Sequence, residues 1–170
     1  MFQEPNGQGG GTAVLVRPVM DLDTALAQLE DLLDLSNVKM KLADADEGPG
    51  LSRDSIDLMD DEYRKFLALQ LMYPDADIVP CKIVDEMWHR HILDTAAYRE
   101  DCEAIFGRFL DHFPYFGMRG EEDAQALNDA YADTLERYRE AFGVPPVDTW
   151  ITVDASSKCK RTACKPQKCR

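Results

Sequence analysis

The stretch AQALNDAYADTLERYREAFG, residues 124–143, decides the fold. Its apolar residues recur every three or four positions, which is the period of a helix that buries one face. Gly143 follows the last of them, and Pro145 and Pro146 come next, as expected where a helix ends. The apolar positions are Ala124, Leu127, Tyr131, Leu135, Tyr138 and Phe142. The stretch therefore predicts a long amphipathic helix.

The same period predicts four further helices along the chain. Residues 21–33, 52–72, 80–92 and 95–107 each place apolar side chains three or four positions apart. Segment 35–42 is compatible with two structures, because its apolar residues fit a helix and also alternate with lysines as in a strand. No βαβ alternation and no internal repeat is present in the sequence.

These segments predict an all-α fold, a compact helical bundle of four to five helices with a flexible C-terminal tail. Thr95 is the expected N-cap of the helix that Gly107 ends. Three regions are expected: a flexible glycine-containing leader over residues 1–20, a helical domain over 21–150, and a basic cysteine-containing tail over 151–170.

Charge is distributed unevenly along the chain. The net charge is −13, but residues 156–170 contain six basic and no acidic side chains. The body is therefore strongly acidic and unsuited to binding nucleic acid phosphates. The basic tail can bind an anionic surface, engage a protein partner or a modifying enzyme, fold back onto the acidic body, or stay solvated. No apolar run reaches the roughly 20 residues that a membrane helix needs, so a cytoplasmic protein that does not bind membranes is expected.

The five cysteines fall into two groups. Cys81 and Cys102 belong to the body, whereas Cys159, Cys164 and Cys169 belong to the tail. An odd number of cysteines argues against a disulfide framework, and the tail spacing does not match a zinc ribbon or finger. The tail thiols can bind a soft metal, or they can belong to an unstructured tail without a function of their own.

The segment DEMWHRHILD, residues 85–94, contains two of the three histidines. On a helix Asp85 and His89 lie four apart and share one face, and His91 and Asp94 lie three apart on another. The two histidines diverge by about 200° at 3.6 residues per turn. They can meet at one site only if the backbone is irregular, or if one binds and the other orients it through a hydrogen bond.

Three interpretations of this segment remain open. Imidazole, carboxylate and thiolate groups suit zinc or iron, so a divalent transition metal site is one. Hydrogen-bonded histidines in an aromatic core are a second, and a Cys102 nucleophile with a histidine base is a third. The candidate metal ligands are Asp85, His89, His91, Asp94, Cys102 and His112.

Two stretches resemble a known family. They are YRKFLAL, residues 63–69, and VDEMWHRHILDTAAYREDCEAIFGRFLDHFPYFG, residues 84–117. They resemble the glycine-rich domain-containing protein-like family, whose hallmark is an aspartate followed by W-H-x-H, a leucine and a tyrosine. The matching residues are Asp85, Trp88, His89, His91, Leu93 and Tyr98, followed by Asp101, Cys102, Gly107 and His112. Asp111 stands where a histidine is frequent in that family.

The resemblance covers about residues 60–145 and implies a family without implying a reaction. It concentrates ligand-capable residues in one place and so favours a site there. The expected function is that of a soluble helical protein whose polar site binds a divalent metal, with catalysis left open. The alternatives are a non-catalytic interaction module, or a carrier for a cysteine-rich tail that is modified or binds a soft metal.

Overall fold

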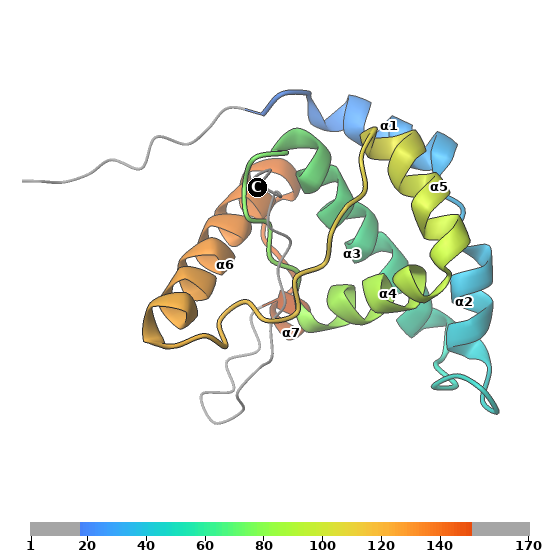
Figure 1. Ribbon diagram of the computed structural model, residues 1–170. Coiled ribbons are helices and arrows are strands. Elements are labelled where there is room, and N and C mark those ends of the chain that lie inside the picture. Colours follow the sequence, from blue (N-terminus) through green and yellow to red (C-terminus); the bar gives the residue numbers. More distant parts are fainter. Residues whose placement is uncertain (1–17, 151–170) are drawn as a thin grey trace, which may run out of the picture.

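The computed structural model describes residues 18–150, and these form seven helices and no strand (Figure 1). Helical residues make up 67% of this part of the chain, which confirms the predicted all-α fold. The helices are α1 (Leu22–Leu32), α2 (Ser36–Ala43), α3 (Arg53–Met72), α4 (Lys82–Leu93), α5 (Thr95–Phe106), α6 (Glu121–Phe142) and α7 (Val147–Trp150). The predictions about the leader before residue 18, the tail and its three thiols lie outside the described residues.

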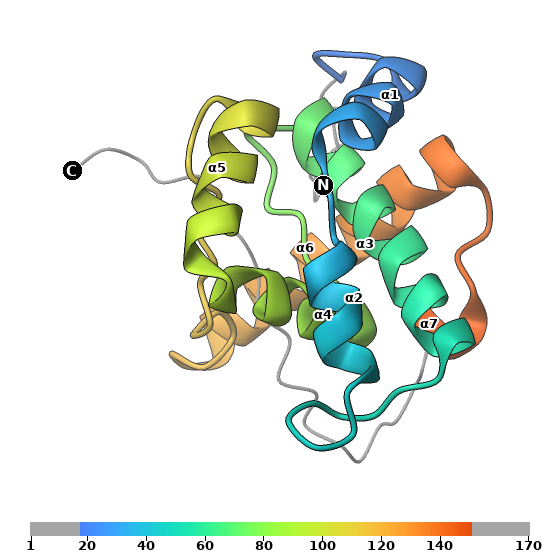
Figure 2. The same cartoon turned by 90° about the vertical axis from the view of Figure 1, so that its right-hand side faces the viewer.

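Helix α3 forms the centre of the fold. It lies between α6 on one side and α1 and α2 on the other, and α4 crosses it (Figures 1 and 2). Residues 66–72 are buried without interruption, so the last two turns of α3 are covered on every side. A helix that is enclosed in this way is the core of its domain rather than a surface element. None of the described helices is both long and apolar enough to cross a bilayer.

The segment whose structure the sequence leaves open is a helix. Leu35, Val38 and Leu42 are buried, whereas Met40 is 68% exposed. Burial therefore follows the three-to-four-residue period of α2 and not the two-residue period of a strand. This helix and α7 bring the number to seven in the described residues, where the sequence predicts four to five.

Helix ends largely follow the predicted signals, with one correction. Gly107 and Gly143 occupy the C-cap positions of α5 and α6, with positive φ angles of 62° and 84°. The predicted Thr95 N-cap is wrong, because Thr95 is the first residue of α5 and Asp94 occupies the cap position. The reason is that α4 and α5 are separated only by Asp94, so no linker precedes the second helix.

A buried carboxylate joins α3 to the C-terminal helices. Glu62 of α3 is 1% exposed and accepts hydrogen bonds from the Tyr138 hydroxyl of α6 and from Trp150 Nε1 of α7, at 2.9 and 2.6 Å. Lys65 Nζ lies 2.8 Å from Oε1 of the same carboxylate. Burial and the neighbouring Glu62 raise the pKa of the Tyr138 hydroxyl, so it remains a hydrogen-bond donor. Three donors thus offset the cost of burying this charge.

Substituting Thr134 with valine tests a long-range contact of the core. The Thr134 hydroxyl is buried, accepts a hydrogen bond from the Val79 amide and donates one to the Ala130 carbonyl. Valine leaves that buried amide without a partner, so the free energy of unfolding should fall by about 1–3 kcal/mol in urea denaturation. Thr134→Ser keeps the hydroxyl and should cost about 1 kcal/mol for the lost methyl group. A valine variant as stable as the unsubstituted protein would contradict the role of this hydrogen bond.

Candidate metal centre

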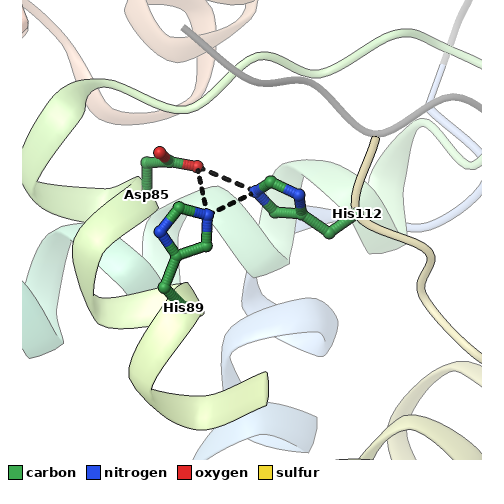
Figure 3. A group of neighbouring side chains, drawn as sticks. All are labelled: Asp85, His89 and His112. Carbon is green, nitrogen blue, oxygen red and sulfur yellow. Dashed lines mark hydrogen bonds and ion pairs between the residues drawn. The ribbon is translucent and has the colours of Figure 1, made fainter. Parts of the chain in front are cut away.

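Two segments of the chain bring three potential ligands together. Asp85 and His89 come from successive turns of α4, and His112 comes from the loop between α5 and α6 (Figure 3). His112 Nε2 lies 3.0 Å from Asp85 Oδ1 and 3.0 Å from His89 Nε2. The third separation, from His89 Nε2 to Asp85 Oδ1, is 3.7 Å. We call Asp85, His89 and His112 the triad.

These separations suit ligands of one small ion as well as direct hydrogen bonds. Two nitrogen ligands at about 2.1 Å from zinc lie roughly 3.0 Å apart at a right angle and roughly 3.4 Å apart at the tetrahedral angle. The three ligand atoms of the triad all lie within 4.8 Å of one another. A metal could therefore replace the hydrogen bonds of the triad without a movement of either backbone segment.

The triad is buried on one side and open on the other. The side chains of His112 and Asp85 are 9% and 14% exposed, whereas that of His89 is 48% exposed. A cavity of about 410 Å³ beside it runs along α4, and its lining includes Lys82 and Arg90. An ion held by the three side chains would therefore have coordination positions left for water or another ligand.

A chain of contacts through Trp88 fixes the loop that carries His112. The Trp88 ring is fully buried and packs against the His112 ring, with centroids 4.6 Å apart. Its Nε1 donates to the Tyr98 hydroxyl at 2.9 Å, and that hydroxyl donates to the Leu110 carbonyl at 2.6 Å. Because Leu110 is only two residues before His112, these bonds place the loop relative to α4 and α5.

His91 lies apart from the triad. It is buried on the other side of α4, where Nδ1 lies 3.0 Å from the Tyr63 hydroxyl and Nε2 lies 2.9 Å from Asp101 Oδ2. Helix α4 continues unbroken to Leu93, so the divergence predicted for a regular helix holds. Both ring nitrogens of His91 are thus engaged by other helices, and the expected convergence of three histidines does not occur.

The neutral imidazole satisfies both of these contacts. A proton on Nε2 is donated to the Asp101 carboxylate, and the unprotonated Nδ1 accepts from the Tyr63 hydroxyl. Burial lowers the pKa of His91, against the opposing effect of Asp101, which favours this neutral form. The second histidine of W-H-x-H therefore joins α4 to α3 and α5, and the first belongs to the triad.

Two other candidate ligands also lie elsewhere. Among residues 18–150, the group of ligand atoms close enough to share an ion contains only the three members of the triad. Asp94 is exposed at the junction of α4 and α5, and Cys102 is buried on α5. The sequence places Asp101 only within the family resemblance, and it gives no sign that Tyr63 is a partner of His91, because these two residues are 28 positions apart.

Both body cysteines should resist alkylation in the folded protein. Burial raises the pKa of Cys81 to about 12 and also raises the pKa of Cys102, so little thiolate forms at mildly alkaline pH. Mass spectrometry of peptides should find both residues modified by iodoacetamide only after unfolding in urea. Rapid modification of Cys102 in the native protein would instead favour the nucleophile interpretation.

Together these observations define an all-α protein with a His₂–Asp cluster supported by an aromatic hydrogen-bonded network. The family model named UCP032817-like matches residues 34–134, from just before α2 into α6, and the match includes the whole triad. The chain belongs to this family, which is uncharacterised. No curated protein and no solved structure matches the chain. Its likeness to the glycine-rich domain-containing protein-like family stays a prediction.

Proposed function

We propose that this protein binds a divalent transition metal, zinc or iron, through His89, His112 and Asp85. The observation that carries the proposal is the meeting of two imidazole nitrogens and one carboxylate oxygen within 4.8 Å. These donors come from two segments that separate contacts fix in place, so the site is largely preformed. Preformed donors bind a metal without the cost of ordering them.

These three ligands favour a metal site in which some coordination positions are not filled by the protein. Two imidazoles and one carboxylate on one side of an ion are the ligands of non-haem iron(II) sites and resemble those of catalytic zinc sites. A structural zinc site would instead use four protein ligands and no open position. The 48% exposure of His89 supports the open arrangement, in which water or a substrate completes the coordination.

Metal content of the purified protein tests the proposal. The full chain is expressed without an affinity tag, purified without chelator, and measured by inductively coupled plasma mass spectrometry. About one equivalent of zinc or iron per chain is expected. The protein stripped with chelator should regain one equivalent in a titration at neutral pH. If neither the purified nor the stripped protein holds zinc, iron, copper or manganese, the metal proposal fails.

As the pH is lowered, the metal affinity should fall more steeply than the affinity of a site made of carboxylates alone. A metal displaces protons from both imidazoles, so at acidic pH each further unit should lower the affinity by about 100-fold. Competition titrations with a coloured chelator over a series of pH values measure this slope. An affinity that does not change with pH would show that the histidines are not ligands. Cobalt(II) absorption at neutral pH reports the coordination number in the same samples.

A further inference from the structure

A second cavity lies away from the triad, between the segment that follows α3 and one face of α6. Its volume is about 500 Å³, which is within the range of small-molecule sites. Tyr73 and Ala76 line it from the segment after α3, and Ala126 and Ala130 line it from α6. Charged side chains complete the lining, so the cavity combines apolar walls with charged groups.

Arg137 lines this cavity and carries a buried hydrogen-bond donor. The residue is 5% exposed, and its guanidinium lies 4.2 Å from the centroid of the Tyr73 ring. Nε and Nη2 both bond to Asp133 Oδ2, at 2.9 and 2.8 Å. Nη1 is buried and has no hydrogen-bond partner in the described part of the chain. Buried donors of folded proteins are nearly always paired, with a protein group, an ordered water or a ligand.

The charges around the cavity define what that ligand must carry. Asp133 neutralises Arg137, and three more carboxylates line the cavity, those of Asp75, Asp77 and Asp129. A simple anion could pair with Nη1 but would be repelled by these carboxylates. A simple cation would be attracted but would leave Nη1 unpaired. A ligand that has both a carboxylate and a cationic group satisfies both requirements.

We propose that this cavity binds a basic amino acid, either free or as the C-terminal residue of a peptide. Its carboxylate accepts from Arg137 Nη1, since a carboxylate is the planar acceptor that suits a guanidinium. Its aliphatic stem packs against Ala126 and Ala130, and its cationic end lies near Asp75 or Asp129. This proposal is independent of the metal site, because the two sets of residues do not overlap.

Calorimetric titration of the full chain with three related compounds tests the ligand chemistry. L-Arginine carries both groups, agmatine lacks the carboxylate, and L-norvaline lacks the cationic side chain. Arginine should bind at least tenfold more tightly than either of the others. A short peptide that ends in arginine, compared with its C-terminal amide, then distinguishes a peptide terminus from a free amino acid. Equal affinity for all three compounds, or binding of none of the ligands, would overturn the proposal.

Two variants and one control locate the binding. Arg137→Met should weaken arginine binding at least tenfold, while Arg139→Met, which changes an exposed arginine paired with Glu136, should not. Because Arg137 is buried, its loss can also disturb folding, so Ala126→Trp provides a second test. Ala126 is exposed at the cavity, and the indole should fill the space without altering the core. If the Ala126→Trp variant binds arginine as tightly as the unsubstituted protein, the arginine site lies outside this cavity and the assignment is refuted.

Discussion

Replacing Trp88 with alanine should lower the free energy of unfolding by about 3–5 kcal/mol, which is typical for removal of a large aromatic side chain from a core. Trp88 is fully buried and packs against Phe66 and His112, with ring centroids 5.1 and 4.6 Å away. Alanine leaves a cavity between α3, α4 and the loop before α6. It also removes the indole N–H that donates a hydrogen bond to the Tyr98 hydroxyl.

Urea denaturation followed by circular dichroism measures this loss, and Trp88→Phe is the matched variant. Phenylalanine keeps most of the packing and loses the Nε1–H donor, so it should cost about 1–2 kcal/mol. An alanine variant that is as stable as the phenylalanine variant would show that packing at this position contributes little. The alanine variant should also bind metal more weakly, because the His112 loop loses its support.

Replacing His89 and His112 together with alanine should abolish metal uptake and leave the helix content unchanged. The change removes both nitrogen donors of the triad and leaves a single carboxylate, which cannot hold a transition metal firmly at neutral pH. His89 is about half exposed, and the loop that carries His112 is also held by the hydrogen bonds of Trp88 and Tyr98, so the helices should persist without these two side chains. Metal analysis and circular dichroism of the same sample separate loss of the site from loss of the fold.

Asp94→Asn is the matched control for this experiment. It alters a carboxylate at the end of the same helix but outside the triad, and it should retain one equivalent of metal. His91→Asn gives a further comparison, since it should destabilise the protein through the contacts to Tyr63 and Asp101 while sparing the triad. Uptake that persists in the double variant would mean that the metal is bound elsewhere.

Local periodicity predicts the elements of this fold better than it predicts their contacts. The spacing of apolar residues anticipates α1, α3, α4, α5 and α6, because each buries one face of a helix. Helix α7 is missed for a physical reason. Its four residues carry no periodic pattern, and it is held by Trp150, which bonds to Glu62 far away in sequence.

The same distinction applies to the triad. Asp85 and His89 are four residues apart, so their common face follows from helix geometry alone, as does the divergence of His91. The position of His112 beside these two residues does not follow from sequence spacing, because it depends on a loop that Trp88 and Tyr98 hold in place. The sequence likewise does not predict that Arg137 Nη1 is buried without a partner, since this depends on how Tyr73 and Asp133 surround the guanidinium.

The carboxylate of Glu62 also bears on the order in which the chain can fold during synthesis. Its donors Tyr138 and Trp150 are 76 and 88 residues further along, so both emerge from the ribosome long after α3 does. Until then, enclosing Glu62 would bury a charge with only Lys65 beside it, at a cost of several kcal/mol. The nascent chain should therefore keep this part of α3 in contact with water. It can complete its core only when Trp150 has left the exit tunnel.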